Sequence, residues 1–339
     1  MPININGSKG IRQNTTEVTK IPVGTTAQRP ANPEPGMIRF NTDEGDVEWY
    51  DDLGDRWIPT SSFPGVVATG GTVTDIEQDG QLFRVHTFTS DGTFDVARGG
   101  KVEYLVVAGG GGGLGPRAYS SAQGSGGGAG GLVNNVLAVG IGTINVEVGN
   151  GGAGNANRDS TTPGENSIFG NIVALGGGGA VDSNIISSSN GDGGSGGGDV
   201  SGGPAGSALQ PTSLSGGFGN DGGFVNPLTS GREFTTVGGG GGGAGQKGFD
   251  GKESPEANAG NGGDGLQVFG NFYAGGGGGG SDSNPGGVGG NGGGGNGSDN
   301  GSQPTAGQSN TGGGGGGGTS AIDGAAGGSG IVIVRYRIG

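Results

Sequence analysis

The sequence predicts an all-β protein: short β-hairpin and strand modules lead into a glycine-rich domain of polyproline-II-like helices and irregular loops. Three observations support this fold class. First, stretches of alternating apolar and polar residues, such as 82–89, are typical of half-buried strands. Second, only 13 of the 95 glycines lie in residues 1–100, so glycine makes up about a third of the rest. Third, uninterrupted glycine runs recur without the strict three-residue repeat that collagen requires.

The chain divides into segments of different composition. A polar arm with little core of its own comes first, and a short module with both tryptophans follows. A strand-rich module then leads into the glycine-rich domain. The expected boundaries are 1–35 for the arm, 36–65 for the hairpin module, 66–108 for the strand module and 109–339 for the glycine-rich domain, which a C-terminal strand at 330–338 closes.

The hairpin module is expected to form a small β-meander. Strands are predicted at 37–41, 47–51 and 57–58, and the sequences TDEGD and DLGD supply the turns between them. A module of this size is marginal by itself. We therefore expect its aromatic core to pack against a neighbour or a copy of itself; this core comprises Trp49, Tyr50 and Trp57.

The remaining strands bracket the glycine runs. Three or four are expected in the strand module, and the predicted positions are 82–89, 93–96, 102–108, 132–139, 143–148, 167–175, 266–273 and 330–338. The last of these, GIVIVRYRI, alternates and is expected to pair with VEYLVVA at 102–108. That pairing would hold the glycine-rich segment between its own entry and exit strands.

A weak internal repeat organises the glycine-rich domain. Residues 167–179 and 267–279 share Phe-Gly-Asn before a glycine run, and runs begin at Gly238, Gly275 and Gly312. Ordering each glycine costs about 0.5–1 kcal/mol more than ordering alanine, so close backbone packing or assembly must offset it. We interpret the runs as buried rods joined by hydrogen bonds and Cα–H···O contacts. The Asn-, Ser-, Asp- and Pro-rich stretches between them are expected to be loops.

Composition excludes several function classes. The net charge is −14, and the 16 Lys and Arg residues are scattered, which argues against binding nucleic acid or anionic membranes. The chain has no cysteine for disulfides or thiolate metal sites. The first residues lack the features of a signal peptide, and no apolar stretch is long enough for membrane insertion.

The sequence motifs do not favour an enzyme or a cofactor. Patterns of the GxGxxG type arise by chance in such a glycine-rich chain, and neither GQKG nor DGKES completes a phosphate-binding loop. The chain's one histidine, His86, lies in a strand-like stretch without a GxSxG motif elsewhere. The nonapeptide calcium repeat fails in both candidate stretches, 151–159 and 262–270, because each lacks Asp at the sixth place, although a calcium ion on clustered aspartates stays open. We expect no catalysis, no cofactor and no metal site.

The aromatic residues of the glycine-rich domain separate into two groups. One group lies in strand-like repeats and is expected to be core: Phe169, Phe269, Phe272 and Tyr273. The other group lies beside glycine in loops, where exposed rings often serve recognition. These candidate receptor-binding residues are Tyr119, Phe218, Phe224, Phe234 and Phe249. The alternative is that the rings cap the ends of the glycine rods.

Several of these motifs together resemble a known family. VVATGGTVTD, RVHTFTSDGTFDV, KVEYLVVAGGGGG and GGSGIVIVRY closely resemble the glycine-rich domain of bacteriophage tail-fibre and other virion proteins, particularly of marine and cyanobacterial phages. The upstream stretch PVGTTAQRPANPEPGMIRFNTDEGDVEWYDDLGDRWIP is similar to a short hairpin module of the same proteins. The resemblance covers about residues 36–339. Adhesin tips of T-even-like phages are a looser analogy.

The resemblance implies a virion appendage, commonly a homotrimer, assembled in the host cytoplasm. The leading expectation is a tail-fibre adhesin that binds a host surface receptor, such as a glycan, through glycine-rich loops. Its N-terminal arm would dock to other tail or baseplate proteins, and a trimer would bury the tryptophans between chains. One alternative is a fibre or capsid decoration protein without recognition. A third, an ice-binding protein, would need a regular threonine face that the sequence lacks.

Overall fold

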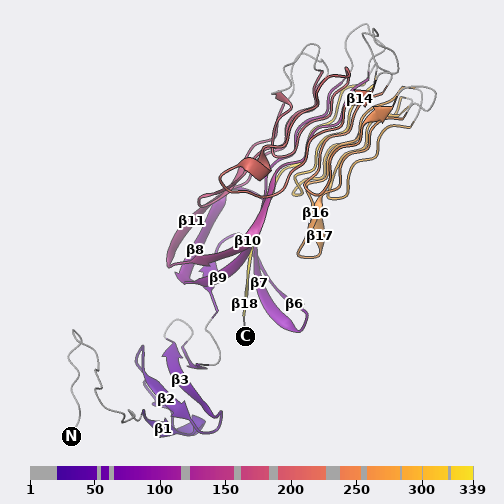
Figure 1. The fold of residues 1–339 in the computed structure, drawn as a ribbon. Coiled ribbons are helices and arrows are strands. Elements are labelled where there is room, and N and C mark those ends of the chain that lie inside the picture. The colour runs from indigo at the N-terminus through magenta and orange to yellow at the C-terminus, as the bar shows by residue number, and fades with distance from the viewer. Residues whose placement is uncertain are drawn as a thin grey trace. The chain divides into compact units, whose positions relative to one another are not determined.

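A computed structural model describes residues 21–51, 55–60, 65–115, 123–155, 162–182, 190–226, 237–252, 258–282, 285–299, 301–319 and 322–338 (Figure 1). The chain splits into two compact units. One contains residues 1–65 and is called the hairpin unit; the other contains residues 66–338 and is called the glycine-rich unit. Within the described residues the fold is β with two short 3₁₀ turns and no α-helix, as predicted. No helix in these ranges has the length and apolar character needed to cross a membrane.

The hairpin unit is a single four-stranded sheet in the order β1-β2-β3-β4. Its elements are β1 Val23–Gly24, the 3₁₀ turn η1 Thr26–Gln28, β2 Ile38–Asn41, β3 Asp46–Asp51 and β4 Arg56–Pro59. The three predicted strands are thus confirmed, and Gly45 supplies the positive φ (68°) of the turn between β2 and β3.

The glycine-rich unit begins as a sandwich of two five-stranded sheets. The first has the order β10-β9-β18-β7-β6 and the second β13-β12-β11-β8-β5. The strands of the first sheet are β6 Thr72–Gln78, β7 Gln81–Phe88, β9 Gly100–Val107, β10 Leu132–Val139 and β18 Ile331–Arg337. Those of the second are β5 Val67–Thr69, β8 Gly92–Arg98, β11 Gly142–Glu147, β12 Ser167–Phe169 and β13 Ile172–Ala174. Residues 66–108 therefore hold five strands, more than expected.

Alternation along each strand places two apolar clusters on opposite faces of the first sheet. Tyr104 and Val106 of β9 join Phe94 and Phe169 of the second sheet in the sandwich core. Leu105, the residue between Tyr104 and Val106, belongs to a second cluster on the other face, where the glycine runs begin. The central strands β9 and β18 are consequently buried on both sides, whereas the edge strand β6 is exposed.

The C-terminal strand β18 closes the unit as predicted. It pairs antiparallel with β9, with Ile331 opposite Val107 and Val334 opposite Tyr104. Its other edge pairs antiparallel with β7. The chain thus enters and leaves the glycine-rich segment through neighbouring strands of one sheet.

Two predicted single strands, 167–175 and 266–273, are hairpins instead. The first is β12–β13, and the second is β16 Leu266–Val268 with β17 Asn271–Tyr273. Their turns differ by one position within the shared Phe-Gly-Asn motif, because Phe169 opposes Ile172 whereas Val268 opposes Asn271. In the second hairpin, Phe269 itself takes a positive φ of 51°.

The glycine runs are extended rods that lie side by side (Figure 1), and their hydrogen bonds repeat every three residues. In the run from Ala108, successive N–H groups donate to three different neighbouring runs and then repeat, over N···O distances of 2.8–3.1 Å. The first neighbour accepts the N–H groups of residues 108, 111 and 114 at the carbonyls of residues 131, 128 and 125. The second accepts those of residues 109 and 112 at the carbonyls of 165 and 162. The third accepts those of residues 110 and 113 at the carbonyls of 328 and 325. Three further runs donate back to its carbonyls, through residues 177 and 180, 152 and 155, and 315 and 318. This is a polyproline-II helix of three residues per turn with six neighbours.

Glycine is required in these rods because neighbouring backbones touch. A Cβ added at Gly111 would lie 2.1 Å from the carbonyl oxygen of Gly178, and one at Gly241 would lie 1.9 Å from that of Gly127. All the residues of the runs at 109–113, 238–243, 275–280 and 312–318 are buried. The interpretation of the runs as buried rods is confirmed.

The polar stretches between the rods are not simply loops, which corrects the sequence analysis. Many of them form further extended runs around the buried ones. Their Asp and Asn side chains accept the N–H of the next outer run, as Asn261 does from Val288 and Asp264 from Asn291, both at 2.8 Å. Asp192, Asp221, Asp250 and Asn296 do the same for Ser207, Ala208, Phe224 and Gly289. Side-chain oxygens thus satisfy donors at the surface of the bundle.

Candidate functional site

The outer runs carry the described receptor-binding candidates. Phe218, Phe224 and Phe249 all lie on this outer layer, and Phe218 and Phe249 are 43% and 47% exposed. Tyr119 and Phe234 lie outside the described residues.

The structure brings Phe224 and Phe249 onto adjacent runs. The N–H of Gly251 donates to the carbonyl of Phe224 at 2.9 Å, and the N–H of Phe224 donates to Asp250 Oδ1 at 3.1 Å. The short strands that follow, β14 Val225–Asn226 and β15 Gly251–Lys252, pair in parallel. The two rings therefore belong to one flank of the bundle, which we call the aromatic flank: Phe224, Lys247, Phe249 and Lys252.

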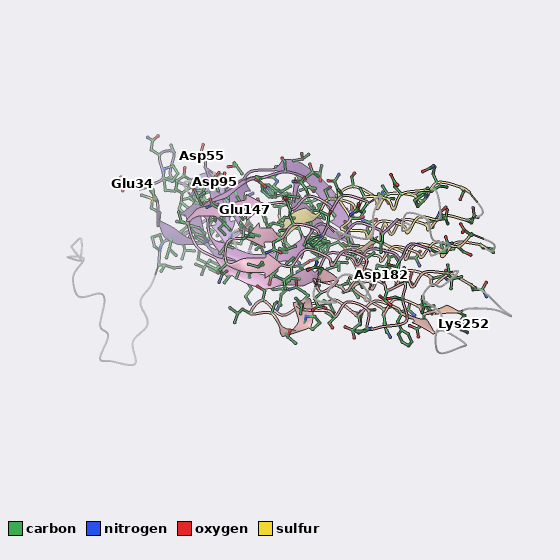
Figure 2. All side chains as sticks on the ribbon, turned by 90° about the horizontal axis from the view of Figure 1, so that it is seen from above. Glu34, Asp55, Asp95, Glu147, Asp182 and Lys252 are labelled. Carbon is green, nitrogen blue, oxygen red and sulfur yellow. The ribbon has the colours of Figure 1, made fainter. Side chains whose placement is uncertain are left out.

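Two lysines accompany these rings. Lys247 Nζ lies 5.3 Å from the centre of the Phe224 ring and 3.8 Å from Asp250 Oδ1. Lys252 is exposed, at the end of the glycine-rich unit farthest from Asp95 and Glu147 (Figure 2). Within the described part of residues 109–330, Lys247 and Lys252 are the only basic residues. The aromatic flank therefore carries positive charges on a protein whose net charge is negative.

Phe218 lies apart from this flank. It exchanges both backbone hydrogen bonds with Leu132 of β10, at 2.8 and 3.1 Å. Six residues of polyproline-II chain, about 19 Å, separate it from Phe224. Phe218 therefore belongs to the base of the bundle.

The sequence analysis did not single out the loop that precedes Phe218 in the chain. It includes the 3₁₀ turn η3, Gln210–Thr212, and carries Leu214, which is fully exposed. The fully buried Gln210 holds the loop: its Oε1 accepts the N–H of Leu175 at 2.6 Å, and its Nε2 donates to the Gly216 carbonyl at 2.5 Å. A buried glutamine in a polar, glycine-rich stretch gives no recognisable sequence signal.

The aromatic residues expected in the core are only partly there. Phe169 and Tyr273 are buried, whereas Phe272 is 45% exposed. Phe272 points outward because it pairs with Gln267 on the solvent face of the β16–β17 hairpin. Phe269 at the turn is half-buried and stacks on the Arg335 guanidinium, 3.9 Å from the ring centre.

His86 is fully buried in the sandwich. Its Nδ1 lies 2.8 Å from the carbonyl oxygen of Gly70, and its Nε2 lies 3.1 Å from the hydroxyl of Tyr336. Burial lowers the pKa of His86, which favours the neutral ring. The neutral tautomer that satisfies both contacts donates from Nδ1 and accepts at Nε2.

A polar cavity of about 420 Å³ lies between the second sheet and the base of the rods. Three carboxylates line it, Asp91, Glu147 and Glu165. Two of these accept backbone N–H groups: Asp91 that of Val148 at 2.8 Å, and Glu165 that of Asn150 at 3.1 Å. In the ranges that the structure describes, no three His, Asp or Glu residues come close enough together to hold a metal ion.

Sequence comparisons agree with this architecture. The glycine-rich domain family matches residues 87–337, from β7 through the whole bundle to β18. No curated protein matches the chain. Because the match covers most of the chain, the protein belongs to the glycine-rich domain family.

Proposed function

We propose that this protein is a bacteriophage virion component, a tail fibre or similar appendage that attaches the particle to the host cell surface. The aromatic flank is the observation that carries the proposal. Two phenylalanines and two lysines lie together on adjacent outer runs of an otherwise acidic protein. Exposed rings beside cations and amides are groups that glycans and other surface polymers bind.

The construction of the bundle supports a recognition role. The interior rods contact one another through backbone atoms, so few side chains on the outer runs are needed to hold them together. Exposed residues other than the Asp and Asn that accept backbone N–H groups can therefore vary without disturbing the scaffold. Rigid scaffolds that carry variable surface groups are common among binding proteins.

The remaining parts of the proposal rest on the family resemblance. The protein would be assembled in the host cytoplasm, form a homotrimer, and dock to tail or baseplate proteins through its N-terminal arm, residues 1–35. It would act without catalysis or a cofactor, and without contacting nucleic acid or inserting into a membrane. A fibre or capsid decoration protein that binds no receptor is the second candidate.

Binding of the labelled protein to susceptible host cells tests the receptor role. We expect Phe249→Ala to reduce binding, and Phe272→Ala to leave it unchanged. Phe272 is a matched control because its ring is 45% exposed, against 47% for Phe249, and lies on the β16–β17 hairpin.

Wild-type protein that fails to bind cells to which the whole phage binds would refute the receptor role. Immunogold labelling of particles with antibody to the glycine-rich unit then decides between the candidates. Gold at the tail supports an appendage, and gold on the capsid supports a decoration protein.

A further inference from the structure

The tripeptide Gly-Asn-Gly occurs four times in the chain, centred on Asn150, Asn261, Asn291 and Asn296. In unfolded chains this sequence is prone to deamidation, the loss of ammonia from the asparagine side chain. Glycine has no side chain to shield the backbone nitrogen that attacks the asparagine. All four asparagines are exposed, so neither the local sequence nor exposure distinguishes them. Their hydrogen bonds do distinguish them.

Asn261 is held at both of the groups that would react. Its Oδ1 accepts the N–H of Val288 at 2.8 Å. The attacking nitrogen would be that of Gly262, and its N–H donates to the carbonyl of Val288 at 2.9 Å. Val288, on the neighbouring outer run, thus fixes the side chain and the nitrogen together. Both bonds must open before the two groups can react.

Asn296 and Asn150 are held in a similar way. The Oδ1 of Asn296 accepts the N–H of Gly289 at 2.8 Å, and the N–H of the following glycine donates to the carbonyl of Gly287 at 2.9 Å. The Nδ2 of Asn150 donates to Glu165 Oε2 at 2.8 Å. In each case the side chain that would be attacked is already bonded to a neighbouring run.

Asn291 differs, because both of its reacting groups are unbonded. Its backbone is anchored, since its N–H donates to Asp264 Oδ1 at 2.8 Å and its carbonyl accepts the N–H of Gly265 at 2.7 Å. Among the residues that the structure describes, however, neither its side chain nor the N–H of Gly292 has a hydrogen-bond partner. Gly292 and Gly293 have positive φ values of 99° and 91° and form a turn there.

We propose that Asn291 is the deamidation site among these four asparagines in the folded protein. The nitrogen of Gly292 attacks Cγ of Asn291, its proton passes to the side-chain amide nitrogen, and ammonia leaves, which closes a five-membered succinimide ring. Water then opens the ring. Cleavage of the new N–Cγ bond gives aspartate, and cleavage of the bond from the same nitrogen to the backbone carbonyl carbon gives isoaspartate. Either product adds a negative charge to a residue that bonds Asp264, and the assignment is independent of what the glycine-rich unit binds.

Mass spectrometry of the full-length protein, incubated in the folded state at mildly alkaline pH, tests the proposal. Asn261, Asn291 and Asn296 lie between Lys252 and Arg335 with no other basic residue, so trypsin releases them on one peptide. Exchange of the amide for a carboxylate raises the mass, and fragmentation of the peptide assigns the gain to each asparagine. We expect Asn291 to react about tenfold faster than the other two, or more, because their bonds must break first.

The same incubation in urea is the control, because the unfolded chain keeps the sequence but loses these hydrogen bonds. The three rates should then be similar. Asn291→Gln should remove the fast-reacting site of the folded protein and leave the other two rates unchanged. The proposal is overturned if Asn261 or Asn296 reacts as fast as Asn291 in the folded protein, if none of the three reacts there while all react in urea, or if the unfolded chain shows the same preference for Asn291.

Discussion

Replacing Gly111 by alanine should destabilise the glycine-rich unit. Gly111 lies in the buried run 109–113, donates its N–H to Gly128 at 2.8 Å and accepts from Gly315 at 3.0 Å. The added Cβ would lie 2.1 Å from the carbonyl oxygen of Gly178. Ordinary carbon–oxygen contacts between backbones are about 3.3–3.6 Å, so the rods would have to separate by roughly 1.2–1.5 Å.

Opposing free-energy terms determine the size of the effect. Overpacking a tight interior costs about 1–3 kcal/mol. The atoms that must move are backbone, so one hydrogen bond is weakened as well, at about 0.5–1.5 kcal/mol. In the opposite direction, alanine lowers the conformational entropy of the unfolded chain, which stabilises the folded state by about 0.4–1 kcal/mol. We expect a net loss of about 2–3 kcal/mol, which corresponds to a fall in Tm of roughly 4–12 °C for a domain of this size.

Thermal unfolding of the full chain by calorimetry measures this loss, with Gly140→Ala as the control. Gly140 is exposed, and a Cβ added there meets no atom within 4 Å. Its Tm should stay the same or rise slightly. If Gly111→Ala melts within about a degree of Gly140→Ala, backbone contact is not what requires glycine in the rods.

Three further predictions concern buried polar groups. Because burial lowers the pKa of His86, the unfolded state binds its proton more readily; stability is complete above about pH 6.5 and falls as the pH drops below it. This dependence should be weaker in His86→Gln when Tm is followed from pH 7.5 to 5.5, and equal slopes would contradict it. Gln210→Ala removes a fully buried side chain that accepts the N–H of Leu175, and it should cost about 1–3 kcal/mol in chemical unfolding; a stability equal to wild type would show that the loop does not depend on Gln210. Arg335→Lys should lower stability by about 1–3 kcal/mol, because lysine cannot both stack on Phe269 and reach Glu103 as the guanidinium does at 2.7 Å; unchanged calorimetric stability would argue that charge alone matters there.

Short-range pattern was enough to predict most strands. Alternation located β7, β9 and β18, and their apolar residues are buried as expected except Leu82, at the start of β7. The same pattern failed at 167–175 and 266–273, because a two-residue turn inside an apolar stretch leaves the alternation almost unchanged. The position of each turn depends on contacts outside the hairpin, such as the one between Phe269 and Arg335.

The candidate site was predictable in its residue types but not in its grouping. The sequence marks Phe218, Phe224 and Phe249 equally, as rings beside glycine. Only the lateral order of the outer runs puts Phe224 beside Phe249 and leaves Phe218 at the base. Likewise, the tryptophans of the hairpin unit look alike in sequence, yet strand register sends Trp49 and Trp57 to opposite faces.

By itself, the sequence determined that this protein is β-rich, that its glycine runs are buried rods, and that its last strand pairs with the strand before the first run. These properties follow from alternation and from glycine's lack of a side chain, both of which are local. Tertiary structure alone decided which rods are neighbours, where the hairpins turn and which side chains share a surface. Glycine has no side chain that could select one neighbouring rod over another. The hydrogen bonds of Gly111 with Gly128 and Gly315 are therefore determined only by the packing of the whole bundle.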